Sequence, residues 1–214
     1  MLATFLIEIC LAIYTLLKYR MNELTFVILL LLTMLGLFQL SEYFVCTSSS
    51  ETWSRLGYVA ITTLPALGIH LFYLLSDNKN RKIVYVSYLV MILFSVYFLA
   101  AEDVFQGYAC TGNYVIFQLN HMAGLIYQTY YFGLMFLSIG LSVFWLNKHK
   151  KSKNKKKLIQ ALIVGYLVFL VPTAVVNAFL PDTRSGIPSI MCGFAVIFAL
   201  ILTLYITPRT LKKK

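Results

Sequence analysis

Long apolar stretches, interrupted by short polar or basic segments, dominate the sequence. They lie at residues 2–17, 24–43, 56–75, 83–101, 122–146, 158–180 and 187–206. Each is close to the length of about 20 residues with which a helix crosses a bilayer. A helix also satisfies its own backbone hydrogen bonds where no water is available. The pattern therefore predicts an all-α membrane protein, with residues 1–214 forming a single seven-helix transmembrane domain.

The connection between the fourth and fifth stretches, residues 102–121, has a different composition. Strand-forming residues surround Gly107 and Gly112 in this segment, and they are Val104, Phe105, Tyr108, Tyr114, Val115 and Phe117. Such residues bounded by glycines are typical of a small β-hairpin. The alternative is an irregular ordered loop, and the sequence leaves both open.

The 18 Lys and Arg residues give the chain a formal net charge of +10. Clustered basic residues are also found in nucleic-acid-binding proteins. Here, however, they fall in the breaks between apolar stretches. With the N-terminus outside, sixteen lie on the cytoplasmic side and only Arg55 and Arg184 lie outside. This asymmetry indicates orientation in a membrane. We expect a multi-pass protein of the cell membrane, in contact with the lipid bilayer and without a nucleic-acid partner.

The four cysteines fall into two groups. Cys46 ends the second stretch and Cys110 lies in the long outer connection, so both are expected on the outer, oxidising side. We predict a disulfide between them, and two unpaired thiols are the alternative. Cys10 and Cys192 lie within predicted spans and are expected to be small packing residues.

Polar side chains within the predicted spans gather toward the outer half. Buried ionisable groups in a membrane often mark a functional site. The candidate ligand-binding residues are Glu8, Gln39, Glu42, Gln118, His121, Gln128 and Asn177. A pocket formed by them would continue to Ser185, Ser189 and Cys192 around Pro188, with walls from Tyr127, Tyr130, Tyr131 and Phe132. The alternative is that these side chains contact lipid headgroups or form hydrogen bonds between helices. This alternative suits Glu8 least, because its carboxylate lies well inside an apolar stretch.

Signatures of enzymes and metal sites are absent from the sequence. His70 has no second His or Cys at ligand spacing, and no HxxxH, CxxC, GxSxG or GxxxxGK motif occurs. No predicted span contains a lysine that could link a retinal. We therefore expect neither a metal, a cofactor nor enzymatic activity.

Several segments resemble the N-terminal seven-transmembrane sensor region of some bacterial and archaeal histidine kinases. The stretch from Trp53 through Arg55 to Pro65 is similar to that family's third span, and Gln39-Leu-Ser-Glu42 to the end of its second. Gly186-Ile-Pro188 is similar to the start of its seventh. The resemblance implies a sensor module. The family continues into signalling domains, whereas this sequence ends at Lys214, so we expect a stand-alone module without kinase activity.

Three functional hypotheses follow. The first is a receptor-like module that binds a small molecule or lipid in its outer half and signals to a separate cytoplasmic or membrane protein. The second is a small transporter, with Glu8 and His70 on a proton or substrate path; the lack of an internal repeat counts against it. The third is a structural subunit of a membrane complex.

Overall fold

The structure, a computed structural model, describes residues 1–48, 50–112, 114–148, 153–180 and 186–210. The long helices in these ranges are α1 (Leu2–Lys18), α2 (Glu23–Ser48), α3 (Glu51–Ser76), α4 (Lys82–Ala100), α5 (His121–Lys148), α6 (Lys153–Phe179) and α7 (Ile187–Leu200). A π-helical segment (Ile201–Ile206) and the short α8 (Thr207–Thr210) continue α7. A 3-10 turn (Glu102–Val104) leads into the strands β1 (Phe105–Cys110) and β2 (Val115–Leu119).

Six of these segments are long and apolar enough to cross a membrane, namely α2 to α6 and the run from α7 through α8. The helix α1 has 17 residues and is shorter than these six. The outer surface is apolar too: large side chains of α4 such as Leu89 and Leu93 are about 60% exposed. Exposed apolar side chains of this size on one face are what a lipid-facing helix requires. The chain is therefore an all-α, multi-pass membrane bundle.

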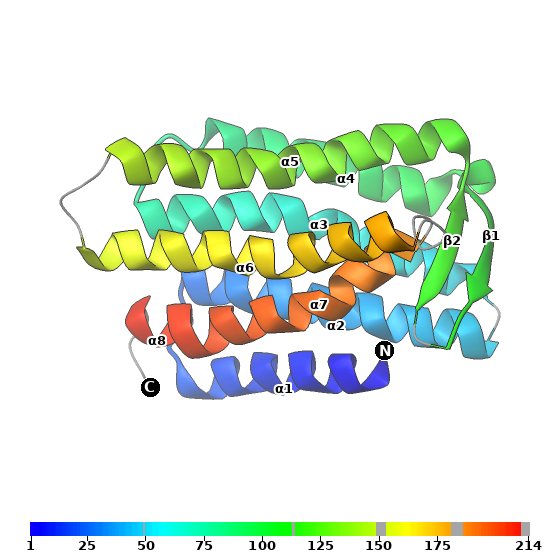
Figure 1. Cartoon of the computed structure of the whole chain (residues 1–214), viewed down its shortest axis with the longest axis horizontal. Helices are drawn as coiled ribbons and strands as arrows, with labels where there is room; N and C mark the ends of the chain where they lie inside the picture. Colours follow the sequence, from blue (N-terminus) through cyan, green and yellow to red (C-terminus); the bar gives the residue numbers. More distant parts are fainter. Residues whose placement is uncertain (49, 113, 149–152, 181–185, 211–214) are drawn as a thin grey trace.

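The helices lie side by side along one axis, and the hairpin closes one end of the bundle (Figure 1). The most buried helix is α3, with 72% of its apolar window inside the protein, and it contacts α2, α4, α5 and α6. The N-terminus lies toward the hairpin end and the C-terminus at the opposite end (Figure 1). We call the hairpin end the outer end and the opposite end the inner end.

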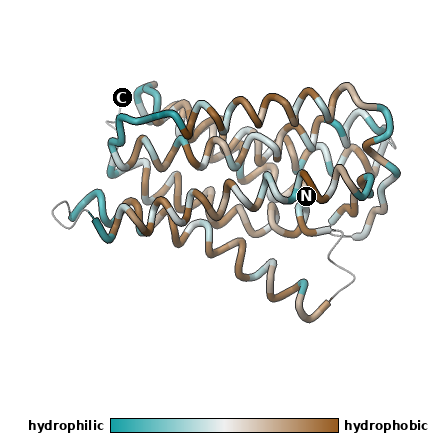
Figure 2. Tube along the Cα trace, turned by 90° about the horizontal axis from the view of Figure 1, so that it is seen from above, coloured by the Kyte–Doolittle hydropathy of each residue, from teal (hydrophilic) through white to brown (hydrophobic). Residues whose placement is uncertain are grey.

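The helix α6 departs from this regular packing. Figure 2 shows its second half leaving the bundle, and its last residues Phe179 and Leu180 are correspondingly exposed. This half contains Pro172, which removes one backbone hydrogen bond from the helix. The departure leaves the neighbouring faces of α5 and α7 without a helix between them at the outer end.

The predicted hairpin is present. Its strands pair antiparallel, from Phe105 opposite Leu119 to Cys110 opposite Val115, with an irregularity between Phe105 and Gly107. Gly107 has a φ of 144°, which a residue with a side chain rarely adopts. The helix α5 begins at His121, so Gln118 lies in β2 and does not share a helical face with His121 and Gln128.

The other helices differ from the predicted apolar stretches mainly because they extend into the polar residues on either side. Residues 153–157 belong to α6, although the apolar stretch begins at residue 158. Likewise, α2 continues to Ser48 and α3 begins at Glu51. Hydropathy detects only the part of a helix that is compatible with lipid, whereas the hydrogen-bonded turns continue into the polar region.

Two glycines allow α6 to pack closely against its neighbours. A Cβ atom on Gly68 of α3 would overlap the Tyr166 hydroxyl, and one on Gly165 of α6 would overlap the Phe198 ring of α7. The Tyr166 hydroxyl also donates a hydrogen bond to Ser138 Oγ of α5 at 3.1 Å. Small residues at helix contacts bring backbones close, which stabilises bundles in lipid.

We predict that Gly165→Ala lowers the free energy of unfolding by about 1–3 kcal/mol, because the new methyl group overlaps the Phe198 ring. Gly193→Ala in α7 is the matched control, since nothing lies within 4 Å of its new Cβ. Thermal unfolding of both variants in the same detergent measures the difference. Equal melting temperatures for the two would contradict the close packing of α6 on α7.

Candidate functional site

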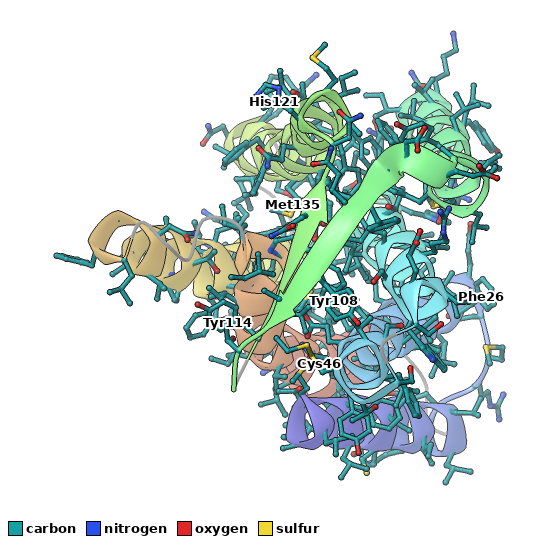
Figure 3. All side chains as sticks on the ribbon, turned by 90° about the vertical axis from the view of Figure 1, so that its right-hand side faces the viewer. Phe26, Cys46, Tyr108, Tyr114, His121 and Met135 are labelled. Atoms are coloured by element: carbon teal, nitrogen blue, oxygen red, sulfur yellow. A yellow bond between two sulfur atoms is a disulfide. The ribbon has the colours of Figure 1, made fainter. Side chains whose placement is uncertain are left out.

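The hairpin is attached to the bundle at several points of the outer end. A disulfide joins Cys110 of β1 to Cys46 of α2, with Cα atoms 5.9 Å apart, as the sequence predicted. In β2, the Val115 amide donates a hydrogen bond to Ser189 Oγ of α7 at 3.1 Å. The Tyr114 ring lies against Gly186, leaving no space for a side chain there. Seen from the outer end, the hairpin crosses the bundle diagonally and passes over Cys46 (Figure 3).

Arg55 of α3 holds the end of α4 and thereby the start of the hairpin. Its guanidinium donates to the backbone carbonyls of Phe98, Leu99 and Ala101 at 3.0, 3.2 and 2.7 Å. It also forms an ion pair with Glu51 at 2.7 Å. The last carbonyls of a helix lack partners within the helix and carry partial negative charge, which a cation satisfies. One side chain therefore fixes the direction in which the chain leaves α4.

Beneath the hairpin lies a pocket of about 460 Å³. A volume of this size is in the range that accommodates a small organic ligand. Residues from α3, the hairpin, α5 and α7 line it: Tyr58, Ile61, Gln106, Phe117, Gln118, Leu119, Asn120, His121, Gly124, Leu125, Tyr127, Gln128, Tyr131, Phe132, Ile187, Pro188 and Met191.

The lining of this outer pocket is aromatic and aliphatic inside and carries amides at the rim. The amides are those of Gln106, Gln118, Asn120 and Gln128, beside the imidazole of His121. None of the described lining residues is Asp, Glu, Lys or Arg. Figure 3 shows His121 at the outer start of α5, beside the hairpin. Such a lining favours a neutral ligand with an apolar body and a few hydrogen-bonding groups.

A second cavity of about 30 Å³ lies deeper in the bundle. Tyr131 and Met191 line both cavities, so these two side chains separate the outer pocket from the bundle centre. The deep cavity is almost wholly apolar, and Pro65 and Gly68 of α3 lie on its wall.

A separate group of polar side chains lies between α1, α2 and α7, and we call it the acidic seam. It consists of Glu8, Gln39 and Glu42, which are 0, 2 and 1% exposed. Thr4 Oγ1 donates to Gln39 Oε1 at 2.9 Å. Both oxygens of each carboxylate and the Gln39 nitrogen have no hydrogen-bond partner among the described residues. On α7, Ser189 lies near Glu42, and Cys192 interacts electrostatically with both carboxylates.

The helix α7 separates the outer pocket from the acidic seam. Ile187, Pro188 and Met191 face the pocket. Ser189 and Cys192 face the seam instead. Pro188 and Cys192 are four residues apart, and Met191 and Cys192 both line the deep cavity, so the two sets occupy adjacent parts of the helix surface. The same helix therefore contributes to both sites.

The predicted site residues do not form one pocket. Gln118, His121 and Gln128 line the outer pocket together with three of the four predicted wall residues, Tyr127, Tyr131 and Phe132. Tyr130 instead donates a hydrogen bond to the Thr62 carbonyl at 2.8 Å. Glu8, Gln39 and Glu42 form the seam. Asn177 lies in α6, which contributes no described residue to the pocket, and Ser185 lies outside the described residues.

Sequence reasoning missed several residues of the outer pocket. Tyr58 and Ile61 lie on α3, and Gln106 lies on β1. The apolar character of α3 predicted a span but could not indicate which face meets the pocket. For Gln106, alternation along the strand is no usable signal, because the pairing of β1 with β2 is irregular between Phe105 and Gly107.

His70 lies at the inner end, away from Glu8. Its Nδ1 is 2.9 Å from the Tyr88 hydroxyl, and its Nε2 is 3.2 Å from Glu23 Oε1. Arg81 pairs with the same Glu23 carboxylate, and this hydrogen bond raises the pKa of Arg81. The group joins the inner ends of α2, α3 and α4. The structure therefore does not place Glu8 and His70 on a common path.

Within the described ranges, no group of three His, Cys, Asp or Glu side chains is arranged to hold a metal ion. Cys192 is buried, as expected of a packing residue, whereas Cys10 is exposed on α1. Neither protein-family models nor curated proteins provide a match to this sequence.

We predict that replacing both Cys46 and Cys110 by alanine lowers the free energy of unfolding by about 2–4 kcal/mol, because the crosslink closes a long chain segment. The sequence separation of the two cysteines is 64 residues. Cys10→Ala, which removes an exposed thiol, is the control. Thermal unfolding with and without reductant measures the effect. A reductant-insensitive wild type would contradict it.

Proposed function

We propose that seven helices cross the cell membrane, with the N-terminus and the hairpin outside and the C-terminus in the cytoplasm. The distribution of Lys and Arg supports this orientation, because sixteen of the 18 would then be cytoplasmic. The disulfide supports it as well, since such bonds persist in oxidising compartments. With 17 residues, α1 is at the short end of the range for a spanning helix.

The function we propose is that of a receptor-like sensor that binds a small neutral molecule or lipid in the outer pocket and signals to a separate protein. The observation that carries this proposal is the outer pocket itself. It joins three of the predicted ligand-binding residues, Gln118, His121 and Gln128, to a wall formed by α7. A ligand there contacts an element that continues to the inner end of the bundle.

The helix α7 is suited to transmit a change of position. Its inner half contains the π-helical segment Ile201–Ile206, and Thr207 Oγ1 donates to the Leu202 carbonyl at 2.7 Å. A π-helical turn is a local register change that is often found at functional positions. For a signal to pass, the ligand must bind one arrangement of α7 more tightly than another. The proposed partner recognises the inner end of this helix.

In contrast, the inner ends of α2, α3 and α4 are tied together. Glu23 pairs with both Arg81 and His70, and His70 bonds to Tyr88. We infer that these helices form the fixed part of the module and that α7 is the moving part. A scaffold subunit that stays rigid needs no division into fixed and moving helices. This division therefore favours the sensor hypothesis over the scaffold hypothesis.

We predict that Gly124→Phe removes a bound molecule from the outer pocket, because a ring at this position projects into the cavity that Gly124 lines. Native mass spectrometry of protein purified in nanodiscs measures the fraction that carries an extra mass. We expect occupancy to fall at least about tenfold. Gly133→Phe is the matched control, since Gly133 lies on the same helix with nothing within 4 Å of its Cβ position. Equal occupancy in both variants would argue against a ligand in this pocket.

A second prediction concerns movement at the inner end. Spin labels at Leu17 and Leu204, both exposed, report the distance between α1 and the π-helical segment in a Cys10→Ser background. Emptying the pocket by Gly124→Phe should change this distance by about 1–2 Å or more. Labels at Phe26 and Tyr85 on the tied helices α2 and α4 are the control and should not move. No change at either pair would favour the scaffold role.

A further inference from the structure

The acidic seam is not accounted for by the outer pocket. Glu8 and Glu42 are 0 and 1% exposed, and they belong to different helices. Both Glu8 oxygens lack a hydrogen-bond partner among the described residues, and beside the Glu42 oxygens lies only the neutral Ser189 hydroxyl as a donor in that part of the chain. An ionised carboxylate without a partner in an apolar interior costs several kcal/mol or more. Each of these carboxylates therefore requires a positive charge or a proton.

Among the described groups that act on the seam, the amino group of Met1 carries a positive charge, but it forms no described ion pair with either carboxylate. Tyr58 of α3 lies within electrostatic range of Glu42, and Cys192 of α7 lies within range of both carboxylates. These two groups are neutral or negative and cannot neutralise a carboxylate. The hairpin contributes only the Val115 amide, which is already bonded to Ser189.

The arrangement along the helices places the seam on a line leading inward from the outer end. Glu42 lies one turn from Cys46, where the hairpin is attached. Gln39 follows one turn deeper, beside Thr4. Glu8 lies one turn deeper again along α1, near the level where Phe5 and Ile9 meet Gly36 of α2. Two anionic groups with an amide between them thus form a short polar ladder.

We propose that Glu8, Gln39 and Glu42 form an intramembrane binding site for a monovalent cation, H⁺ or Na⁺. Two ionised carboxylates carry two negative charges, and each charge can be neutralised by one H⁺ or Na⁺. No third His, Cys, Asp or Glu side chain in the described part of the chain completes a metal-holding group. This excludes the usual ligand set of a transition metal, since such ions select His and Cys in numbers.

Occupation of the site would fix α7 against α1 and α2. Ser189 accepts the Val115 amide, so its hydroxyl proton remains free to be donated toward Glu42. An empty, doubly charged seam attracts water into the α7 contact. A filled seam removes this effect. The site therefore controls how tightly α7 packs.

The test is thermal unfolding of the full chain in nanodiscs from acidic to alkaline pH, in NaCl or in choline chloride. A carboxyl that holds a proton only in the folded state makes stability fall as pH rises, because the folded protein binds more protons than the unfolded one. In choline chloride we expect the melting temperature to fall by about 5 °C or more toward alkaline pH. Restoration by NaCl identifies Na⁺ as the occupant, and no restoration identifies H⁺.

The double variant Glu8→Gln/Glu42→Gln should lose this dependence on pH and Na⁺, because an amide needs no cation. Glu102→Gln, which removes an exposed carboxylate at the same end, is the matched control and should retain it. A wild type and a double variant with the same pH and Na⁺ dependence would overturn the proposal.

Infrared spectroscopy of the wild type provides a measurement that does not depend on a folded variant. A protonated carboxyl shows a carbonyl band that persists above the pH at which exposed glutamates ionise. Its presence supports H⁺, and a Na⁺-induced shift of the carboxylate bands supports Na⁺. The absence of both signals would overturn the proposal, whatever the outcome with the variants.

Discussion

A single hydrogen bond, from the Val115 amide to the Ser189 hydroxyl, joins the two parts of the outer end that matter most. Val115 belongs to a hairpin that the disulfide ties to α2, and Ser189 belongs to α7. Because a backbone amide in a buried position must have a partner, the hairpin and α7 cannot separate without loss of free energy. Together with the disulfide and the Tyr114 contact with Gly186, this hydrogen bond holds the hairpin over the outer pocket.

The remaining architecture divides into fixed and less restrained parts. Arg55 caps α4 from α3, and the Glu23, His70 and Arg81 group ties the inner ends of α2, α3 and α4. The helix α6 is held closely at one point and not at another. Gly165 lets the Phe198 ring of α7 approach the α6 backbone, whereas the half of α6 that contains Pro172 leaves the bundle. The outer pocket consequently has α7, and not α6, as its wall.

The sequence predicted the helices well, because the bilayer imposes one simple requirement on a span, its apolar length. It also predicted the disulfide, from two cysteines on the same side, and offered the hairpin as one of two alternatives, from the β-branched and aromatic residues around Gly107. It did not predict that Glu42 and His121 belong to different sites. That separation depends on the rotation of α2 and α5 about their axes, and these helices are apolar on nearly all faces, so hydropathy contains little information about rotation. The position of Gln118 was missed because α5 begins at His121, after a strand.

The distribution of unpaired polar atoms supports a moving α7 on grounds separate from the pocket. In the described residues, the buried side-chain atoms without a partner belong to Glu8, Gln39, Glu42 and Thr203. Elsewhere, buried hydroxyls such as those of Thr62, Ser138 and Ser142 have partners. Glu8 and Glu42 lie within electrostatic range of Cys192 of α7, and Thr203 lies in the π-helical segment that continues α7. A native protein leaves the hydrogen bonds of such buried groups unmade chiefly where function requires it.

If a cation in the seam favours one position of α7, then a ligand in the pocket that favours the same position must bind more tightly when the cation is present. The cation must likewise bind more tightly when the ligand is present. The two sites need no direct contact for this, because the same helix forms a wall of both.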